Sequence, residues 1–387
     1  MKNSLDFNLQ YSYLEGQNFI QCFASAYMFL EATTDPAAIF YDPDVGGHCF
    51  GCGSGGELHH CKKDKTAAKR CAFFFLFNTM CGNSSIRRRF NGTPTEMQKM
   101  IGGDDQGCGS DFTVDFLFGY AGYEYRKCTD AASFKAEIIA AIDAGRPVIA
   151  KTKQKCPDFH KTVEIPVFHV ITGYDGDALT VPHTIYYDNP WANPTLKPER
   201  IPGYDDLEVL YIFGKKTTRR HTLKDGLNNI RRVMEYNIKE GLWDEYLTKL
   251  GGCDKFPSDD GLDKAGPDER QARAKHLAET NLYMYNFCSF GGALNCDSKL
   301  PNHDLHKELF SPALSEVWSG INETHWAIVD AGHKTGKLNW EQIWLIDDPA
   351  KISALSTEIC EAIVTARTAD IEVLEIIKQA INVLNNT

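Results

Sequence analysis

A cysteine, a histidine and an aspartate occur in this chain in the order that a cysteine-nucleophile enzyme requires. Cys22 stands near the start of a segment with apolar side chains at helical spacing. His169 lies inside an apolar, strand-like run, and Asp188 ends a similar run. In such chemistry the thiolate attacks a carbonyl carbon, the imidazole moves the proton, and the acid holds the imidazole in the reactive tautomer. The sequence therefore predicts a catalytic triad of Cys22, His169 and Asp188.

The segment around Cys22 has the pattern of a helix. Residues 21–32 carry apolar side chains at helical spacing and contain neither glycine nor proline. Cys22 falls in the first turn, where unpaired backbone N–H groups and the helix dipole favour a negatively charged thiolate. A single cysteine on a helix is more often a packing residue than a nucleophile. The prediction therefore depends on Cys22 occurring together with His169 and Asp188.

The histidine and the aspartate fall in a region of short β-rich runs, each bounded by Gly, Pro or Asp. The runs are residues 147–151, 167–172, 178–181, 184–187 and 207–213. Residues 173–177, with the sequence Gly-Tyr-Asp-Gly-Asp, have the composition of a tight hairpin turn. The pattern predicts an antiparallel sheet in which neighbouring strands bring the imidazole and the carboxylate side by side.

The strand pattern ends near residue 216, and helical patterns follow. The helices expected after this boundary are residues 221–241, 243–250, 268–284, 314–331, 351–365 and 369–384. One more helix is expected before the sheet, at residues 133–144. Residues 40–110 are rich in glycine, cysteine and basic side chains, and we interpret them as an elaboration of the first half. The sequence thus predicts an α+β domain over residues 1–216 and a helical domain over residues 217–387.

Composition narrows the classes of function. The 387 residues are enough for two domains, and 43% hydrophobic with 24% charged residues is typical of a folded globular protein. A formal net charge of −11 argues against general nucleic-acid binding. No apolar run approaches the roughly 20 residues that cross a bilayer, and residues 1–6 lack a signal-peptide pattern. A cytoplasmic location is expected, and most of the thirteen cysteines are expected to be free thiols.

Three segments resemble the C39-like branch of the papain-like cysteine-protease superfamily. Residues 145–150 (Gly-Arg-Pro-Val-Ile-Ala) are similar to its Gly-x-Pro-Val/Ile strand. Residues 168–175 (Phe-His-Val-Ile-Thr-Gly-Tyr-Asp) are similar to its histidine strand, and residues 187–190 (Tyr-Asp-Asn-Pro) to the segment that supplies its third catalytic member. The resemblance implies an α+β papain-like fold, with a helix carrying the cysteine and an antiparallel sheet carrying the histidine and the acid.

The same resemblance implies a role for each site residue. Cys22 would be the nucleophile and His169 the general acid and base. Asp188 would orient the imidazole, with Asn189 as the alternative because papain-like enzymes often use asparagine there.

A glutamine in this family helps to form the oxyanion hole. Gln17, upstream of the nucleophile, matches it. The Gln-Cys-Phe-Ala sequence at residues 21–24 departs from the family's usual Asp-Cys-Gly-Pro or Cys-Gly-x-Cys-Trp. Gln21 therefore stays an alternative to Gln17.

The helical half is similar to the butirosin-biosynthesis acyltransferase family and to the amide synthetases of the closthioamide type. Residues 241–250, residues 272–277 and the expected helix at 314–331 carry this likeness. It implies transfer of an acyl group from a carrier-protein thioester, bound through phosphopantetheine, to a small-molecule amine, with no cofactor required. Two alternatives remain open: a papain-like peptidase or amidase, and a non-catalytic module that binds a metal or a partner.

A basic cluster in an otherwise acidic chain favours the carrier-protein interpretation. Residues 61–92 contain eight basic side chains and a single acidic one, Asp64. Such a patch would dock an acidic carrier protein and its phosphate. The eight candidates are Lys62, Lys63, Lys65, Lys69, Arg70, Arg87, Arg88 and Arg89.

The cysteines of the Gly-rich region offer a weak metal motif. Cys49 and Cys52 have the Cys-x-x-Cys spacing of a zinc site, and Cys61 follows two histidines. No second Cys-x-x-Cys pair completes the motif. The sequence therefore predicts no metal, with Cys49, Cys52 and Cys61 as the candidate ligands if one binds.

Overall fold

The computed structural model describes residues 2–7, 19–34, 65–87, 89, 93–102, 109–157, 162–181, 202–249, 303–321 and 349–387. The chain divides into two compact units. The first comprises residues 1–81, 99–225 and 295–309, and the second comprises residues 82–98, 226–294 and 310–387. The division at 225/226 lies nine residues beyond the expected boundary, and each unit also takes one segment from the other half of the sequence.

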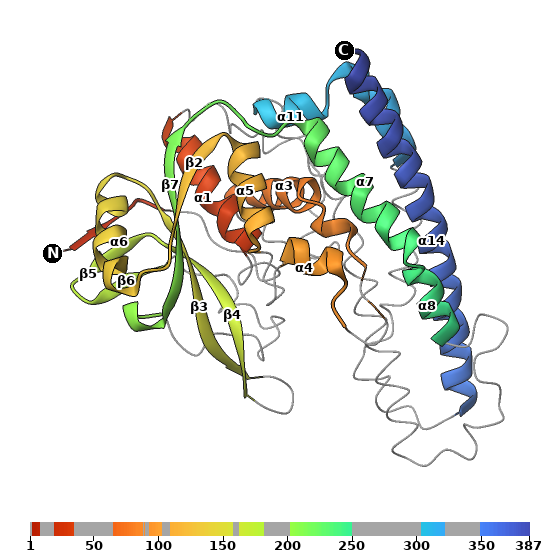
Figure 1. Ribbon diagram of the computed structural model, residues 1–387, viewed down its shortest axis with the longest axis horizontal. Helices are drawn as coiled ribbons and strands as arrows, with labels where there is room; N and C mark the ends of the chain where they lie inside the picture. Colours follow the sequence, from red (N-terminus) through yellow and green to blue (C-terminus); the bar gives the residue numbers. More distant parts are fainter. Residues whose placement is uncertain are drawn as a thin grey trace. The chain divides into compact units, whose positions relative to one another are not determined.

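The first unit contains a four-stranded antiparallel sheet with strand order β2-β7-β3-β4 (Figure 1). Its strands are β2 (Tyr123–Cys128), β3 (Val148–Pro157), β4 (Thr162–Ile171) and β7 (Leu207–Lys216). This arrangement confirms the expected α+β class with antiparallel pairing. In β3 and β4, the expected strands at 147–151 and 167–172 extend to ten residues each.

A second sheet has three strands, and one of them includes residues that the sequence predicted to form a turn. It consists of β1 (Lys2–Ser4), β5 (Gly173–Asp175) and β6 (Ala178–Thr180). The hairpin turn is confined to Gly176 and Asp177, where Gly176 has a φ of 62° that favours glycine. The expected turn at residues 173–177 is therefore wrong in extent, because pairing with β1 and β6 keeps residues 173–175 extended.

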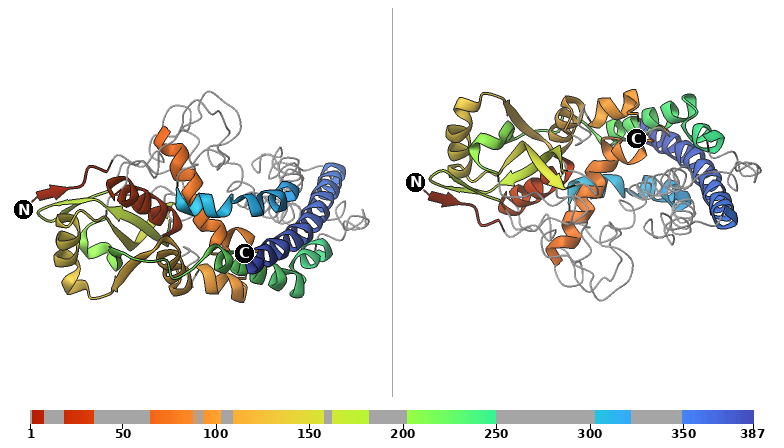
Figure 2. Two further views of the ribbon diagram at one scale, coloured as in Figure 1. Left: turned by 90° about the horizontal axis from the view of Figure 1, so that it is seen from above. Right: turned by 90° about the horizontal axis from the view of Figure 1, so that it is seen from below.

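Helices of the first unit cover both faces of the larger sheet (Figure 2). The helices that pack on the sheet are α1 (Phe19–Thr34), α5 (Asp111–Ala121) and α6 (Phe134–Asp143). The unit also contains α3 (Lys65–Met80), which packs on α1, and α11 (Asp304–Leu309), while α4 (Glu96–Gly102) crosses the division between the units. Short 3-10 helices occupy Asn83–Ser85, Ala131–Ser133 and Tyr204–Asp206. The expected helices at 21–32 and 133–144 are confirmed as α1 and α6.

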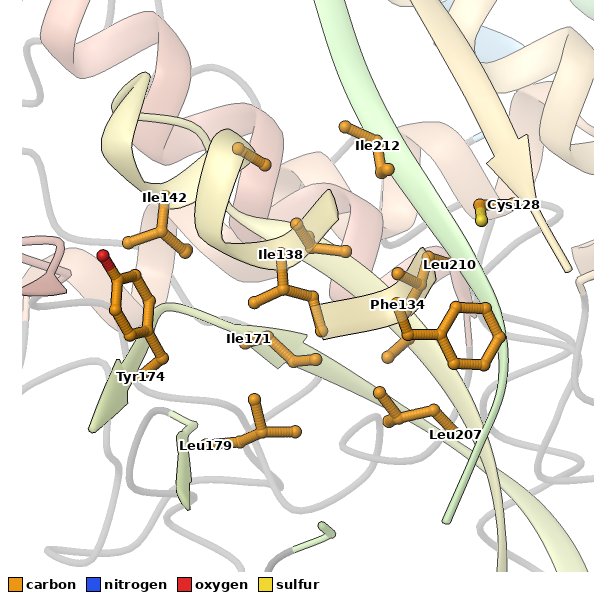
Figure 3. Close-up of a cluster of buried hydrophobic side chains, with 13 residues drawn as sticks. Cys128, Phe134, Ile138, Ile142, Ile171, Tyr174, Leu179, Leu207, Leu210 and Ile212 are labelled. Atoms are coloured by element: carbon orange, nitrogen blue, oxygen red, sulfur yellow. The ribbon is translucent and has the colours of Figure 1, made fainter. Parts of the chain in front are cut away.

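Packing on the α6 face forms a hydrophobic cluster (Figure 3). Phe134, Ile138 and Ile142 extend from α6 toward the sheet. There they meet Ala150 of β3 and Ile171 of β4, which lie on neighbouring, paired strands. Phe134, Ile138 and Ile142 are four residues apart on the helix, and Val148 and Ala150 of the cluster are two apart on β3, so each element turns one apolar face to the other.

The opposite face of the sheet packs on α1 through aromatic side chains. The ring of Phe19 lies 5.6 Å from Phe168 of β4 and 5.1 Å from Tyr211 of β7. One turn later, the ring of Phe23 lies 5.5 Å from Phe213 of β7. Edge-to-face and stacked aromatic pairs of this kind stabilise a core beyond the area they bury. They hold α1 against the strand that carries His169.

The described part of the second unit is helical. It contains most of α7 (Leu223–Lys239), α8 (Leu242–Lys249), residues 312–321 and the 38-residue α14 (Pro349–Asn386), which runs beside α7 and α8 (Figure 1). The sequence predicted two helices where α14 is continuous. Residues 366–368 contain no glycine or proline, and the Thr368 hydroxyl donates a hydrogen bond to the backbone carbonyl of Val364 at 3.0 Å. The helix therefore continues through them.

Candidate functional site

Cys22 is the fourth residue of α1 and lies in its first turn, as the sequence predicts. The thiol is not part of a disulfide, and the residue is 0% exposed. Every residue of α1 from Phe19 to Glu31 is buried, so this helix is surrounded by protein on all sides. The buried set includes the polar side chains Gln21 and Ser25, which flank Cys22 on the helix.

The sides of α1 have distinct roles. Because successive residues turn by about 100°, Phe19, Phe23 and Tyr27 follow one another along the side that meets the sheet and α3. Cys22 lies on the side next to Phe19, and Ser25, three residues later, lies nearly opposite the aromatic side. The thiol therefore lies beside the aromatic contact with the sheet.

His169 is buried in β4, where it pairs with Ala150 of β3. Burial disfavours the charged imidazolium and lowers the pKa of His169 to about 4, although the nearby Asp206 carboxylate acts in the opposite direction. The imidazole is therefore neutral at pH 7, which is the form that accepts a proton.

The strand register also sets the face on which His169 lies. Side chains alternate between the two faces of a strand. Phe168 points to the α1 face, where it contacts Phe19, and Ile171 belongs to the cluster on the α6 face. His169 shares its face with Ile171. The structure thus brings α1 and β4 together, but it turns the imidazole toward the face opposite α1.

Three of the predicted catalytic and oxyanion-hole residues fall outside the part of the chain that the structure describes. Gln17, Asp188 and Asn189 lie outside the described residues, as do the expected strand at 184–187 and the expected helix at 268–284. The alternative oxyanion donor, Gln21, precedes Cys22 on α1 and is fully buried.

Arg87, one of the eight residues of the basic cluster, is buried and does not lie on the surface. Its side chain is only 7% exposed and makes two hydrogen bonds to Asp370, at 2.7 and 3.1 Å. The indole N–H of Trp243 donates to the same carboxylate at 2.9 Å. Arg87 is therefore an internal structural residue of the second unit, and the prediction that it docks a carrier protein is wrong.

Other members of the basic cluster have different positions. Arg89 makes ion pairs with Glu240 and Glu245 at 3.0 and 3.3 Å, which reduce the positive charge it offers to a partner. The remaining six are Lys65, Lys69 and Arg70 in α3, and Lys62, Lys63 and Arg88, which lie outside the described residues. The units also divide the cluster, because residues 62–70 belong to the first and residues 87–89 to the second.

A buried polar network in the first unit was not predicted from the sequence. The carboxylate of Glu31, 3% exposed, accepts hydrogen bonds from Tyr123 at 2.8 Å and from Lys216 at 2.6 and 2.7 Å. His303 lies 3.8 Å from it and contacts the Tyr27 hydroxyl at 2.9 Å. The backbone N–H of Leu305 donates to Nδ1 of His303, which leaves the ring proton on Nε2. The network joins four segments that are distant in the sequence.

This network predicts an acid-dependent loss of stability. Burial by itself raises the pKa of Glu31, but His303, Lys216 and Tyr123 outweigh it and hold the pKa at about 2. Because the folded pKa is lower than that of an unfolded glutamate, the stabilisation is complete above about pH 4.5 and is lost as the pH falls toward 2. Replacing Glu31 with Gln is expected to destabilise the protein by about 3 kcal/mol at pH 7 and by much less at pH 2.5.

Urea unfolding at the two pH values measures the change. The matched control is Glu124→Gln, a substitution of an exposed carboxylate on β2 beside Tyr123, which should alter stability by no more than about 0.5 kcal/mol. Equal destabilisation by Glu31→Gln at pH 7 and pH 2.5 would contradict an ionised, hydrogen-bonded carboxylate.

Metal-binding and membrane-spanning features are not found in the described part of the chain. Within it, no group of three or more His, Cys, Asp or Glu side chains is arranged to hold a metal ion. The candidate ligands Cys49, Cys52 and Cys61 lie outside those ranges. Among the described helices, none is long and apolar enough to cross a bilayer.

Comparison of the chain with family models, curated proteins and solved structures found no match.

Proposed function

We propose that this protein is a papain-like cysteine enzyme that transfers an acyl group from a thioester, carried by a carrier protein, to an amine. Cys22 is the nucleophile and His169 the proton carrier. Asp188, or Asn189 in its place, orients the imidazole, and Gln17 or Gln21 helps to hold the oxyanion. The observation that carries the proposal is the contact between Phe19 and Phe168, because it sets the helix of Cys22 against the strand of His169.

The proposed reaction has two balanced steps. The Cys22 thiolate attacks the thioester carbonyl, a new C–S bond forms, and the carrier thiolate leaves and takes up a proton. The amine then attacks acyl-Cys22, a C–N bond forms, and the C–S bond to Cys22 breaks. His169 takes the proton from the amine, and the Cys22 thiolate is regenerated.

Two features support this chemistry over hydrolysis of a peptide. A thioester donor exchanges one thiolate for another, so the first step does not need a protonated amine leaving group. The complete burial of Cys22 favours an acyl-enzyme shielded from water, which lets an amine compete as the acceptor.

The orientation of His169 is the point on which the proposed mechanism is most directly tested. A base must come within hydrogen-bond reach of the proton it accepts, and the alternation along β4 turns the imidazole away from the α1 face. The variant His169→Ala therefore decides the role of this residue. A fall in amide formation of about 100-fold or more supports His169 as the base, and an unchanged rate removes it from the mechanism.

The proposal is tested by incubating the full chain with an acyl-phosphopantetheine thioester and recording its intact mass. We expect a mass increase of one acyl group at Cys22, and faster loss of this adduct when a small amine is added. An adduct that decays at the same rate with and without amine would identify a hydrolase. The absence of any adduct at Cys22 would exclude the acyl-transfer mechanism for these donors.

A further inference from the structure

Ser25 is a fully buried hydroxyl on α1 whose Oγ has no hydrogen-bond partner within the described structure. A buried donor left in this state costs free energy, and most buried polar groups in proteins are paired. The other helical hydroxyls indicate what Ser25 does not do. Thr33 and Thr365 donate to backbone carbonyls of their own helices, at 2.8 and 3.0 Å. Ser25 makes no such bond, so its proton stays available to another acceptor.

The position of Ser25 directs that proton toward Cys22. The two residues are three apart on α1, and side chains at this spacing are neighbours on a helix surface. The Cα–Cβ bonds of a helix tilt toward its N-terminus, so the Ser25 side chain extends over the preceding turn, which contains Cys22. Both residues are 0% exposed, and bulk water therefore does not compete for the hydroxyl.

We propose that Ser25 is a positioning residue whose hydroxyl donates a hydrogen bond to the Cys22 sulfur when the thiol is ionised. The hydroxyl keeps its proton throughout, and it stabilises the thiolate relative to the thiol. In the resting structure the Ser25 hydroxyl makes no hydrogen bond within the described residues. A thiolate is a much stronger acceptor than a neutral thiol, so ionisation of Cys22 draws the hydroxyl onto the sulfur. The inference rests on the proposed role of Cys22 as the nucleophile, and it adds the group that activates it.

The test measures how fast Cys22 is alkylated by iodoacetamide between pH 6 and pH 10. In this reaction the sulfur forms an S–C bond and iodide leaves, so the rate follows the thiolate fraction. Peptide mass mapping reports each cysteine separately. In the full-length Ser25→Ala protein, we expect the midpoint of the Cys22 profile to move up by about one pH unit and the rate at pH 7 to fall about tenfold.

Two controls separate positioning from structure. Ser25→Thr retains the hydroxyl and should restore a profile close to that of the wild type. Cys81, also fully buried in the first unit, should keep its own profile in every variant. The urea midpoint of Ser25→Ala should not fall, because the substitution removes a buried group that has no partner in the resting protein.

The acyl-thioester assay on the same variants distinguishes this inference from the proposed function. An acyl adduct at Cys22 with identical alkylation profiles in wild type and Ser25→Ala would overturn the inference and leave the proposed function standing. A shifted profile without any acyl adduct would support the inference and overturn acyl transfer. A Cys22 that iodoacetamide does not alkylate in the wild type up to pH 10 would overturn the inference, because a buried sulfur that a small electrophile does not reach is not an activated nucleophile.

Discussion

Replacing Cys22 with alanine is expected to abolish the acyl adduct and all amide formation, while the protein keeps its fold. Removing the nucleophile of a covalent mechanism lowers turnover by a factor on the order of 10⁶, because no other group can form the intermediate. The substitution removes one buried sulfur from a well-packed helix, so it should lower stability by only about 1 kcal/mol. Intact mass after incubation with the thioester and amide formation followed by chromatography measure the two effects.

Cys81→Ala is the matched control. Cys81 is a fully buried cysteine of the same unit that is not part of a disulfide, and its thiol donates to the carbonyl of Asn78 at 3.5 Å. Its replacement removes the same atoms from a similar environment, so it should leave the adduct and the turnover unchanged. Full turnover in Cys22→Ala would reject the covalent mechanism, and equal losses in both variants would attribute the effect to packing.

Replacing Arg87 with methionine is expected to destabilise the second unit by about 3–5 kcal/mol. The substitution leaves the Asp370 carboxylate buried with the indole N–H of Trp243 and without its cation. It also removes the contact of the guanidinium with the Trp243 ring, whose centroid lies 5.4 Å away. Since the chain has two units, hydrogen exchange of residues 365–375 in α14 is a more specific measurement than a single melting temperature.

Two further variants define the origin of this effect. Arg87→Met combined with Asp370→Leu should recover much of the lost stability, because no buried charge then remains unpaired. Lys378→Met removes an exposed ion pair with Glu375 on the same helix and should change stability by less than about 0.5 kcal/mol. Wild-type exchange protection in Arg87→Met would show that the ion pair is not a structural contact.

Local pattern was sufficient for many elements of this fold. The 3.6-residue spacing around Cys22 predicts α1, and the β-rich runs bounded by turn residues predict β3, β4 and β7 within a few residues. Such signals arise from short-range sterics and from the burial of one face, so they are readable in a window of about ten residues. The order of Cys22 and His169, and the chemistry that this order suggests, are readable in the same way.

The burial and the pairing of individual side chains could not be predicted from the sequence, because contacts between residues distant in the chain create them. Arg87 has the appearance of a surface cation among other cations, and only its pairing with Asp370, 283 residues away, makes it an internal residue. Glu31 is one acid in an apolar helix until Tyr123, Lys216 and His303 converge on it.

The same limit applies to the candidate site. Sequence patterns identify Cys22 and His169 and predict the elements that carry them, but the face of the sheet on which His169 lies depends on the pairing of β4 with β3 and on the packing of α1. The unpartnered hydroxyl of Ser25 likewise depends on what surrounds α1 in the folded chain. Residue types and local periods are properties of short segments, whereas burial, pairing and facing are set by long-range packing, which a single sequence does not encode in any local window.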